Sequence, residues 1–205
     1  MGIVRLQLQI MGACYWTRTR PYITNGAFII NIHPIAGDIF EIAPKVADAA
    51  ILYLNNGFCM RDLTWRQIRE NWCPHAFHPN LHNIDGRPWQ HSADVLYRVH
   101  VPDSQLRFIY IFSNPNNSRG FTTLENLELS LIRSLNSLSD LNITRISLIH
   151  IPFVTENKLP TLENNICSAN LMVRTLQNWN LENPSVFSDA YLVDLSDGFR
   201  RQITF

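Results

Sequence analysis

The sequence predicts an α/β domain of three layers (α/β/α), in which a central mixed, mostly parallel sheet lies between helices. Three observations predict it. Short apolar runs of strand length alternate with segments whose apolar residues recur every three or four positions. Hydrophobic residues make up 46% of the 205 residues, which is enough to bury one sizeable core. Alternation of strands and helices is typical of a parallel sheet covered by helices, and two adjacent strands near residues 95–113 make the sheet mixed.

The whole chain, residues 1–205, is expected to form a single domain. Residues 1–26 are expected to be an N-terminal strand and an irregular arm, and residues 27–205 the core. Val4, Leu6 and Leu8 alternate with polar residues, which indicates a strand rather than a signal peptide. Residues 12–25 mix aromatic residues and arginines without a regular period, and therefore predict an arm.

Six further strands are expected in the core, each an apolar run bounded by turn residues. They cover residues 27–33, 49–54, 95–101, 107–113, 144–151 and 186–195. Pro34 is expected to end the first strand, and the turn-forming Asn55-Asn56-Gly57 the second. Because ligands of such sheets bind at the carboxyl ends of the strands, the loops after the second, fourth, fifth and sixth strands are where a site is expected.

Three helices are expected between these strands. Thr64 and Gln67 form a capping-box pattern, which predicts a helix over residues 62–72, followed by a loop over residues 71–90 that is rich in proline and histidine. Thr122 and Glu125 form a second capping box. The apolar stripes of the second and third helices are Leu124, Leu127, Leu131, Leu135 and Leu138, then Leu162, Ile166, Ala169, Val173 and Leu176.

The bulk composition makes several classes of partner improbable. Seventeen basic residues balance seventeen acidic ones, so there is no overall field to attract nucleic acid. The four cysteines are scattered rather than paired, which favours a reducing, cytoplasmic location. No apolar stretch approaches the roughly 20 residues that cross a bilayer, so no membrane partner is expected.

Several motifs, in this order, resemble those of the macro domain, the ADP-ribose-binding fold. Gly37-Asp38-Ile39 is followed by a strand that begins after Asp48 and leads into Asn55-Asn56-Gly57. Residues 108–116 (FIYIFSNPN) look like the family's strand ending in a Val-Gly-Pro-Asn turn, and residues 146–160 (ISLIHIPFVTENKLP) look like its strand and second phosphate loop. The resemblance covers residues 28–199 and implies a three-layer fold whose ligand is ADP-ribose or an ADP-ribosylated macromolecule.

The resemblance also implies roles for individual residues. Asp38 would accept a hydrogen bond from the adenine amino group with Ile39 beside it, and Phe199 would stack on adenine. Asn55 would contact the distal ribose, the position linked to catalysis in hydrolytic members, and Asn56 is the adjacent catalytic candidate. The remaining implied ligand contacts are Gly57, Asn114, Phe153, Val154, Thr155, Glu156, Asn157 and Lys158.

The chain departs from the family's pattern in its phosphate loops. The family has a run of glycines after the asparagine, but here only Gly57 occurs there, and the second loop reads Val154-Thr155-Glu156-Asn157 instead of Gly-Thr-Gly. Because phosphate-cradling loops normally need glycine, these departures favour binding of ADP-ribose over hydrolysis of an ADP-ribosyl linkage. Two predicted helices begin near residues 62 and 161, and Arg61 and Lys158 lie before them. These helix N-termini and basic side chains offer other contacts to the diphosphate.

Other interpretations of the same residues remain open. Asp38 can be a turn residue that accepts from its own backbone amides, and Asp194 a capping residue of the last turn. Cys73, His75, His78 and His82 are ligands of the type that zinc prefers, although a histidine-rich loop without metal is expected more often, so no cofactor is predicted first. Two alternative functions follow: an interaction module that has lost the ligand, and a metal-dependent hydrolase that uses this loop.

Overall fold

Six strands form one sheet in the order β1-β6-β5-β2-β4-β3. The structure is a computed structural model, which describes residues 30–55, 67, 68, 70–72, 94–114, 123–153 and 161–194. The strands are β1 (Asn31–Ala36), β2 (Ala49–Asn55), β3 (Val95–Arg98), β4 (Phe108–Asn114), β5 (Arg145–Ile149) and β6 (Asp189–Asp194). Neighbouring strands are parallel except for β3 and β4, which are antiparallel. The prediction of a mixed, mostly parallel sheet is therefore confirmed.

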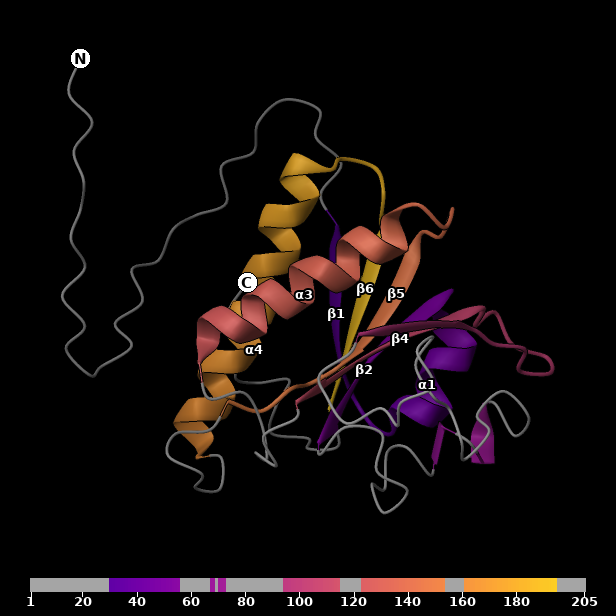
Figure 1. The fold of residues 1–205 in the computed structure, drawn as a ribbon, viewed down its shortest axis with the longest axis horizontal. Helices are drawn as coiled ribbons and strands as arrows, with labels where there is room; N and C mark the ends of the chain where they lie inside the picture. Colours follow the sequence, from indigo (N-terminus) through magenta and orange to yellow (C-terminus); the bar gives the residue numbers. More distant parts are fainter. Residues whose placement is uncertain are drawn as a thin grey trace, which may run out of the picture.

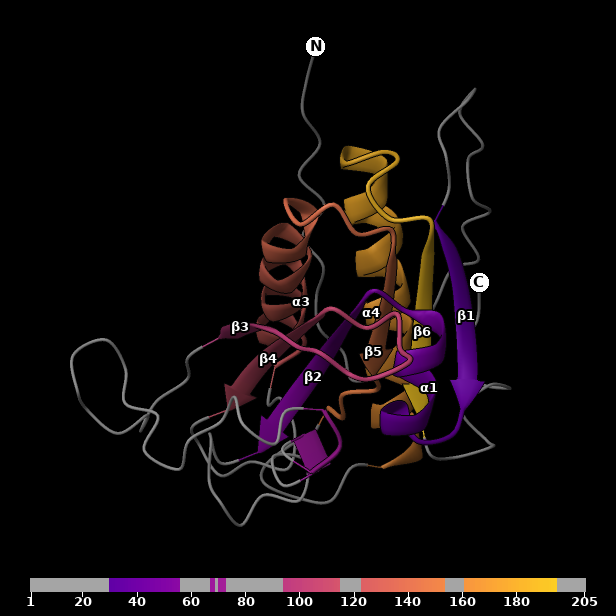
Figure 2. The ribbon, with the colours of Figure 1, turned by 90° about the vertical axis from the view of Figure 1, so that its right-hand side faces the viewer.

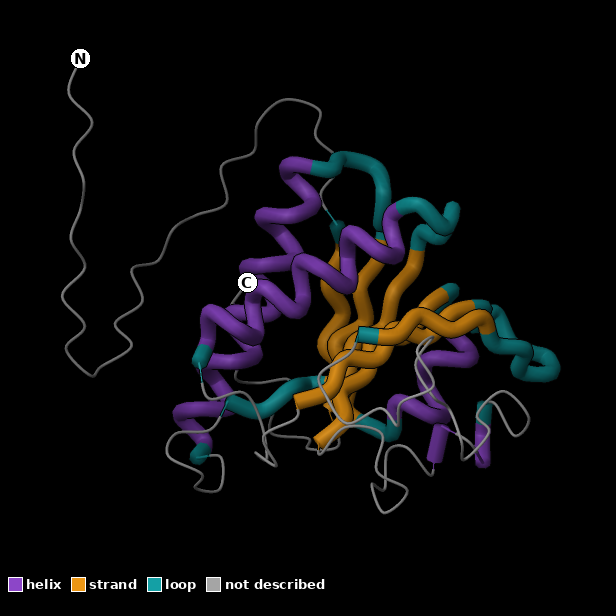
Figure 3. The backbone as a smooth tube through the Cα atoms, viewed as in Figure 1, coloured by secondary structure: helices purple, strands orange, loops and turns teal. Residues whose placement is uncertain are grey.

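Helices cover both faces of the sheet. Helices α3 (Leu124–Ser139) and α4 (Leu162–Glu182) lie together on one face, and the shorter α1 (Ile39–Val46) lies on the other (Figure 1; Figure 3). The helical residue Ile68 and Trp72, in the turn that follows, pack on the α1 face, where the Trp72 ring lies 4.7 Å from that of Phe40. None of the helices in these ranges is long and apolar enough to cross a membrane.

The side chains of β2 show why the central strand is buried on both faces. Ala49, Ile51 and Tyr53 pack in the hydrophobic cluster beneath α3 and α4. The alternate residues, Ala50 and Leu52, pack in a second cluster beneath α1. This period of two is the alternation that a pleated strand imposes, and it explains the nearly continuous apolar run in the sequence.

Pro34 does not end the first strand, contrary to the expectation. Strand β1 continues through it to Ala36, and Pro34 pairs with Leu192 of β6. The amides of Asn31 and Gly37 donate to carbonyls on the β6 side, at 2.9 and 2.8 Å, so with a period of two the nitrogen of Pro34 faces away from β6. Among the described strands β1 lies at the edge of the sheet, and a missing N–H on its outer side takes no hydrogen bond from the pairing with β6.

The expected helix starts also need correction. Helix α3 is capped by Thr123, whose hydroxyl accepts from the amide of Asn126 at 3.2 Å, and not by Thr122 in a box with Glu125. Helix α1 was not expected at all. At the start of α4 Leu162 is 62% exposed, so it does not belong to the buried stripe of that helix.

Candidate functional site

Five parallel strands end along one edge of the sheet, here called the carboxyl edge (Figure 2). The register fixes which strand ends lie side by side. Asn55, the last residue of β2, pairs with Asn114, the last residue of β4. Ala36, the last residue of β1, pairs with Asp194, the last residue of β6. The strand ends that the resemblance assigns to ADP-ribose contacts therefore meet at this one edge.

Asp38 lies at the carboxyl edge, where it caps α1. One carboxylate oxygen accepts from the amide of Phe40 at 2.9 Å, and the Asp38 carbonyl accepts from the amide of Ile42 at 3.0 Å. Gly37 precedes it with φ 148, a conformation that favours glycine. A Cβ at Gly37 would also lie 2.7 Å from a methyl of Ile42. The turn role considered for Asp38 is thus present, and its contact with adenine stays a prediction.

Other predicted residues are only partly described. Ile39 is 3% exposed and packs in the cluster beneath α1. Phe153 is half-buried and follows β5 at the carboxyl edge. Several predicted site residues lie outside the described ranges: Asn56, Gly57, Cys73, His75, His78, His82, Val154, Thr155, Glu156, Asn157, Lys158 and Phe199. Their roles stay predictions.

His150 joins three elements at the carboxyl edge, and sequence reasoning did not find it. It follows β5 directly, and its amide donates to the carbonyl of Val193 at 2.8 Å. Its Nδ1 lies 2.6 Å from Oδ2 of Asp194, and its Nε2 lies 2.8 Å from Oγ of Ser168 on α4. The His150 side chain is only 6% exposed. The one signal in the sequence was a histidine inside an otherwise apolar strand prediction.

Polar contacts link this cluster from β6 into α4. The Ser168 hydroxyl lies 2.8 Å from Nε2 of His150 and 3.0 Å from the carbonyl of Asn165, one turn earlier in α4. The other ring nitrogen, Nδ1, lies 2.6 Å from the Asp194 carboxylate. Asp194, His150, Ser168 and Asn165 thus form one chain of consecutive polar contacts.

These three residues have the composition of a hydrolytic triad but cannot act as one. Ser168 is fully buried, so a substrate carbonyl cannot reach its hydroxyl. The cluster therefore fixes geometry and does not perform nucleophilic catalysis.

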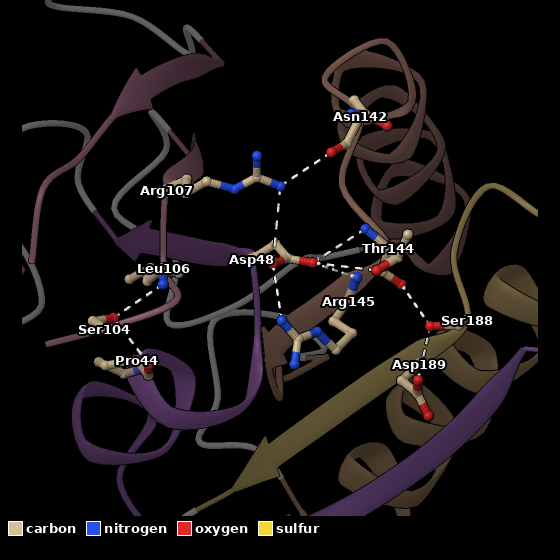
Figure 4. A network of polar contacts seen from close by, with 10 residues as sticks. All are labelled: Pro44, Asp48, Ser104, Leu106, Arg107, Asn142, Thr144, Arg145, Ser188 and Asp189. Carbon is tan, nitrogen blue, oxygen red and sulfur yellow. Dashed lines mark hydrogen bonds and ion pairs between the residues drawn. The ribbon is translucent and has the colours of Figure 1, made fainter.

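The opposite, amino edge of the sheet holds a polar network centred on Asp48 (Figure 4). Its carboxylate accepts from the amides of Thr144 and Arg145, at 3.2 and 3.0 Å, and from the Arg145 guanidinium at 3.1 Å. Burial alone would raise the pKa of the Asp48 carboxyl, but these hydrogen bonds outweigh it and lower the pKa below the usual value. The network joins the starts of β2 and β5, and this role is structural.

A hollow of about 620 Å³ lies in the connection between β3 and β4, also at the amino edge. Two of its polar side chains form hydrogen bonds within the protein. The Ser104 hydroxyl donates to the carbonyl of Pro44 at 2.9 Å, and the Arg107 guanidinium donates to the carbonyl of Asn142 at 3.0 Å. The hollow is therefore a feature of the hairpin and does not overlap the candidate site.

Comparison with known proteins shows the fold. No family model matches the sequence, and no curated protein matches it. A Trypanosoma brucei macrodomain in complex with ADP has a TM-score of 0.59 at 10% identity, over 84% of this chain and 66% of that one. The same macrodomain in complex with ADP-ribose has a TM-score of 0.58 at 9% identity, over 84% and 67%. The macro domain of ganglioside induced differentiation associated protein 2 has a TM-score of 0.57 at 14% identity, over 89% and 86%. This chain thus spans slightly less than two thirds of the first of these chains.

Proposed function

Because this chain has the macro domain fold, we propose that it binds ADP-ribose, free or attached to a macromolecule, at the carboxyl edge of its sheet. In this proposal Asp38 accepts from the adenine amino group and Asn55 contacts the distal ribose. The diphosphate lies between them, against the loop that joins β5 to α4. The nucleotide recognised is therefore an adenine nucleotide with a second ribose.

The observation that carries the proposal is the juxtaposition of strand ends. The amide of Gly37, next to Asp38, donates to the carbonyl of Asp194 at 2.8 Å, and Asn55 pairs with Asn114. Residues from four strands thus meet at one edge, which is where open parallel sheets bind ligands. Two Trypanosoma brucei macrodomain structures of similar fold hold ADP and ADP-ribose.

The diphosphate contacts must come from something other than glycine-rich loops. Helix α4 begins close after β5, and its cap, Thr161, accepts from the amide of Asn164 at 3.1 Å. The first amides of α4 point out of the helix and carry part of the helix dipole, which favours an anion. We propose that these amides, together with Lys158 and Arg61, replace the missing loop contacts.

Isothermal titration with ADP-ribose tests the proposal, and two substitutions of Asp38 separate its two roles. Asp38→Ala removes both the carboxylate and the α1 cap, whereas serine is a good cap without the carboxylate. We expect the wild type to bind one ADP-ribose, and both variants to bind about tenfold more weakly, since a hydrogen bond to a charged group contributes roughly 1.5 kcal/mol. Only Asp38→Ala should also lower the free energy of unfolding, by about 1 kcal/mol.

Thr123→Ala is the matched control, because it removes the cap of α3 on the other face of the sheet. It should lower the free energy of unfolding without weakening the binding of ADP-ribose. Full binding by Asp38→Ser would contradict the adenine role and leave Asp38 as a cap. No heat and no thermal shift with the wild type at millimolar ligand would contradict the nucleotide proposal as a whole.

Hydrolysis of an ADP-ribosyl linkage is a second, dependent proposal. It assigns Asn55, with Asn56 beside it, to orienting the distal ribose for attack by water. Incubation with an ADP-ribosylated protein should then release ADP-ribose, and Asn55→Ala should abolish release while ADP-ribose still binds. Binding without release by the wild type would leave this chain as a binding module.

A further inference from the structure

We propose that His150 is a positioning residue for the diphosphate of the ligand, because it fixes the start of α4 against the ends of β5 and β6. The inference rests on the proposed function and names the device that replaces a glycine-rich loop. Through its ring, His150 contacts two elements that follow β5 in sequence. Asp194 belongs to β6 and lies 44 residues away, and Ser168 belongs to α4 and lies 18 residues away.

The contacts of His150 lie before and after the connection from β5 to α4. The connection from β5 to α4 leaves the sheet at His150 and reaches the α4 cap at Thr161. His150 anchors its beginning, by its amide bond to Val193 and its ring contact with Asp194. Ser168, in the second turn of α4, anchors the helix that ends it. His150 thus contacts β6 at the point where the chain leaves β5, and it contacts the second turn of α4, the helix whose first amides are proposed to bind the diphosphate.

The contacts of His150 with Asp194 and Ser168 are shielded from water. The His150 side chain is 6% exposed and that of Asp194 19%, so water competes little for these hydrogen bonds. Ser168 also donates to Asn165 at 3.0 Å, one turn earlier in α4. Contacts therefore run from Asp194 through His150 and Ser168 to Asn165. They fix the rotation of the first two turns of α4 about the helix axis and their position along it. Placement within a few tenths of an ångström is what an anion needs when helix amides are its donors.

The two ring nitrogens of His150 face two different partners. Nδ1 lies 2.6 Å from the Asp194 carboxylate, and Nε2 lies 2.8 Å from the Ser168 hydroxyl. A side chain with a single polar end keeps at most one of these contacts. Asparagine places an amide N–H near the position of Nδ1, so His150→Asn keeps a donor toward Asp194 and loses the bond to Ser168.

The test is a double-mutant cycle in ADP-ribose affinity, with isothermal titration of the wild type, Ser168→Ala, His150→Asn and the double variant. We expect each single variant to bind about tenfold more weakly, the effect of losing roughly one buried hydrogen bond. Because both substitutions break the same contact, the double variant should bind no more weakly than either single one. A role confined to global stability would give no such coupling in affinity.

Ser134→Ala is the matched control. Ser134 is fully buried in α3 and donates to the carbonyl three residues earlier, Leu131, at 2.7 Å, as Ser168 does to Asn165. It has no histidine partner among the described contacts, so its substitution should leave ADP-ribose affinity unchanged.

The outcomes separate the two proposals. Wild-type affinity in Ser168→Ala or His150→Asn would overturn the positioning role while ADP-ribose binding stands. An equal loss of ADP-ribose affinity in Ser134→Ala would also overturn the positioning role, since any buried helical serine would then affect binding. Absence of ADP-ribose binding by the wild type would overturn both proposals.

Discussion

At the scale of single residues, Asp48 shows how one buried carboxylate joins segments that are distant in the chain. It accepts from Thr144 and Arg145 with its side chain, and from the amides of Arg107 and Phe108 with its carbonyl. It therefore joins the starts of β2, β4 and β5 (Figure 4). The resemblance identified Asp48 only as the residue before a strand, because partners some 60 and 97 positions away are set by strand order.

The stability contributed by Asp48 should depend on pH in a definite direction. Its pKa in the folded protein lies below the usual 3.8, so its contribution is complete above pH 3.8 and is lost as the pH falls through the folded value. Asp48→Asn should lower the free energy of unfolding by about 2 kcal/mol at pH 7, since it leaves buried donors without a charged acceptor. Urea unfolding should show this difference shrinking at pH 3. Asp140→Asn, at an exposed position, is the charge control, and an equal loss at both pH values would contradict the role of the carboxylate.

At the scale of elements, a helix could be predicted from the sequence when it was long and when its apolar residues recurred at helical spacing. The stripe Leu127, Leu131, Leu135 and Leu138 predicted α3, and all four side chains are fully buried. Helix α1 was missed because it has eight residues and contains Pro44, which usually ends a helix. A signal was nevertheless present, since Asp38 and Glu41 have the spacing of a capping box.

The one-residue shift at the start of α3 gives an element-scale prediction. Because the Thr123 hydroxyl accepts from the amide of Asn126, Thr123→Ala should cost about 1 kcal/mol of stability, and Thr123→Ser should cost much less. Glu125→Ala should change stability little if no capping box operates there. Thermal unfolding monitored by circular dichroism would measure all three variants. A larger loss in Glu125→Ala than in Thr123→Ala would favour the original capping-box assignment.

At the scale of the whole molecule, three layers and a mixed sheet were predictable, whereas the contacts between layers were not. Alternation along β2 is a local property, so burial on both faces could be inferred from its apolar run. The meeting of His150 with Asp194 and Ser168 depends on β6 lying beside β5 and on the rotation of α4. Neither is encoded in a local period, and the resemblance, although its motif over residues 146–160 includes His150, gave that residue no role.

The sheet separates stability from the proposed binding, which gives a prediction for the molecule as a whole. The Asp48 network lies at the amino edge and the proposed site at the carboxyl edge, about 20 Å apart along the seven residues of β2. Substitutions that far apart, with no shared partner, should act independently. Asp48→Asn should therefore lower the free energy of unfolding and leave the dissociation constant of ADP-ribose unchanged.

Unfolding with ligand present measures both quantities together. At a ligand concentration one hundred times the dissociation constant, ADP-ribose should add about 2.7 kcal/mol to the free energy of unfolding of the wild type and of Asp48→Asn alike. Ser168→Ala should show a smaller increment at the same concentration, and urea unfolding with and without ligand would measure all three. A severalfold weaker affinity in Asp48→Asn would mean that the two edges are coupled through β2, and that the amino-edge network also helps to shape the site.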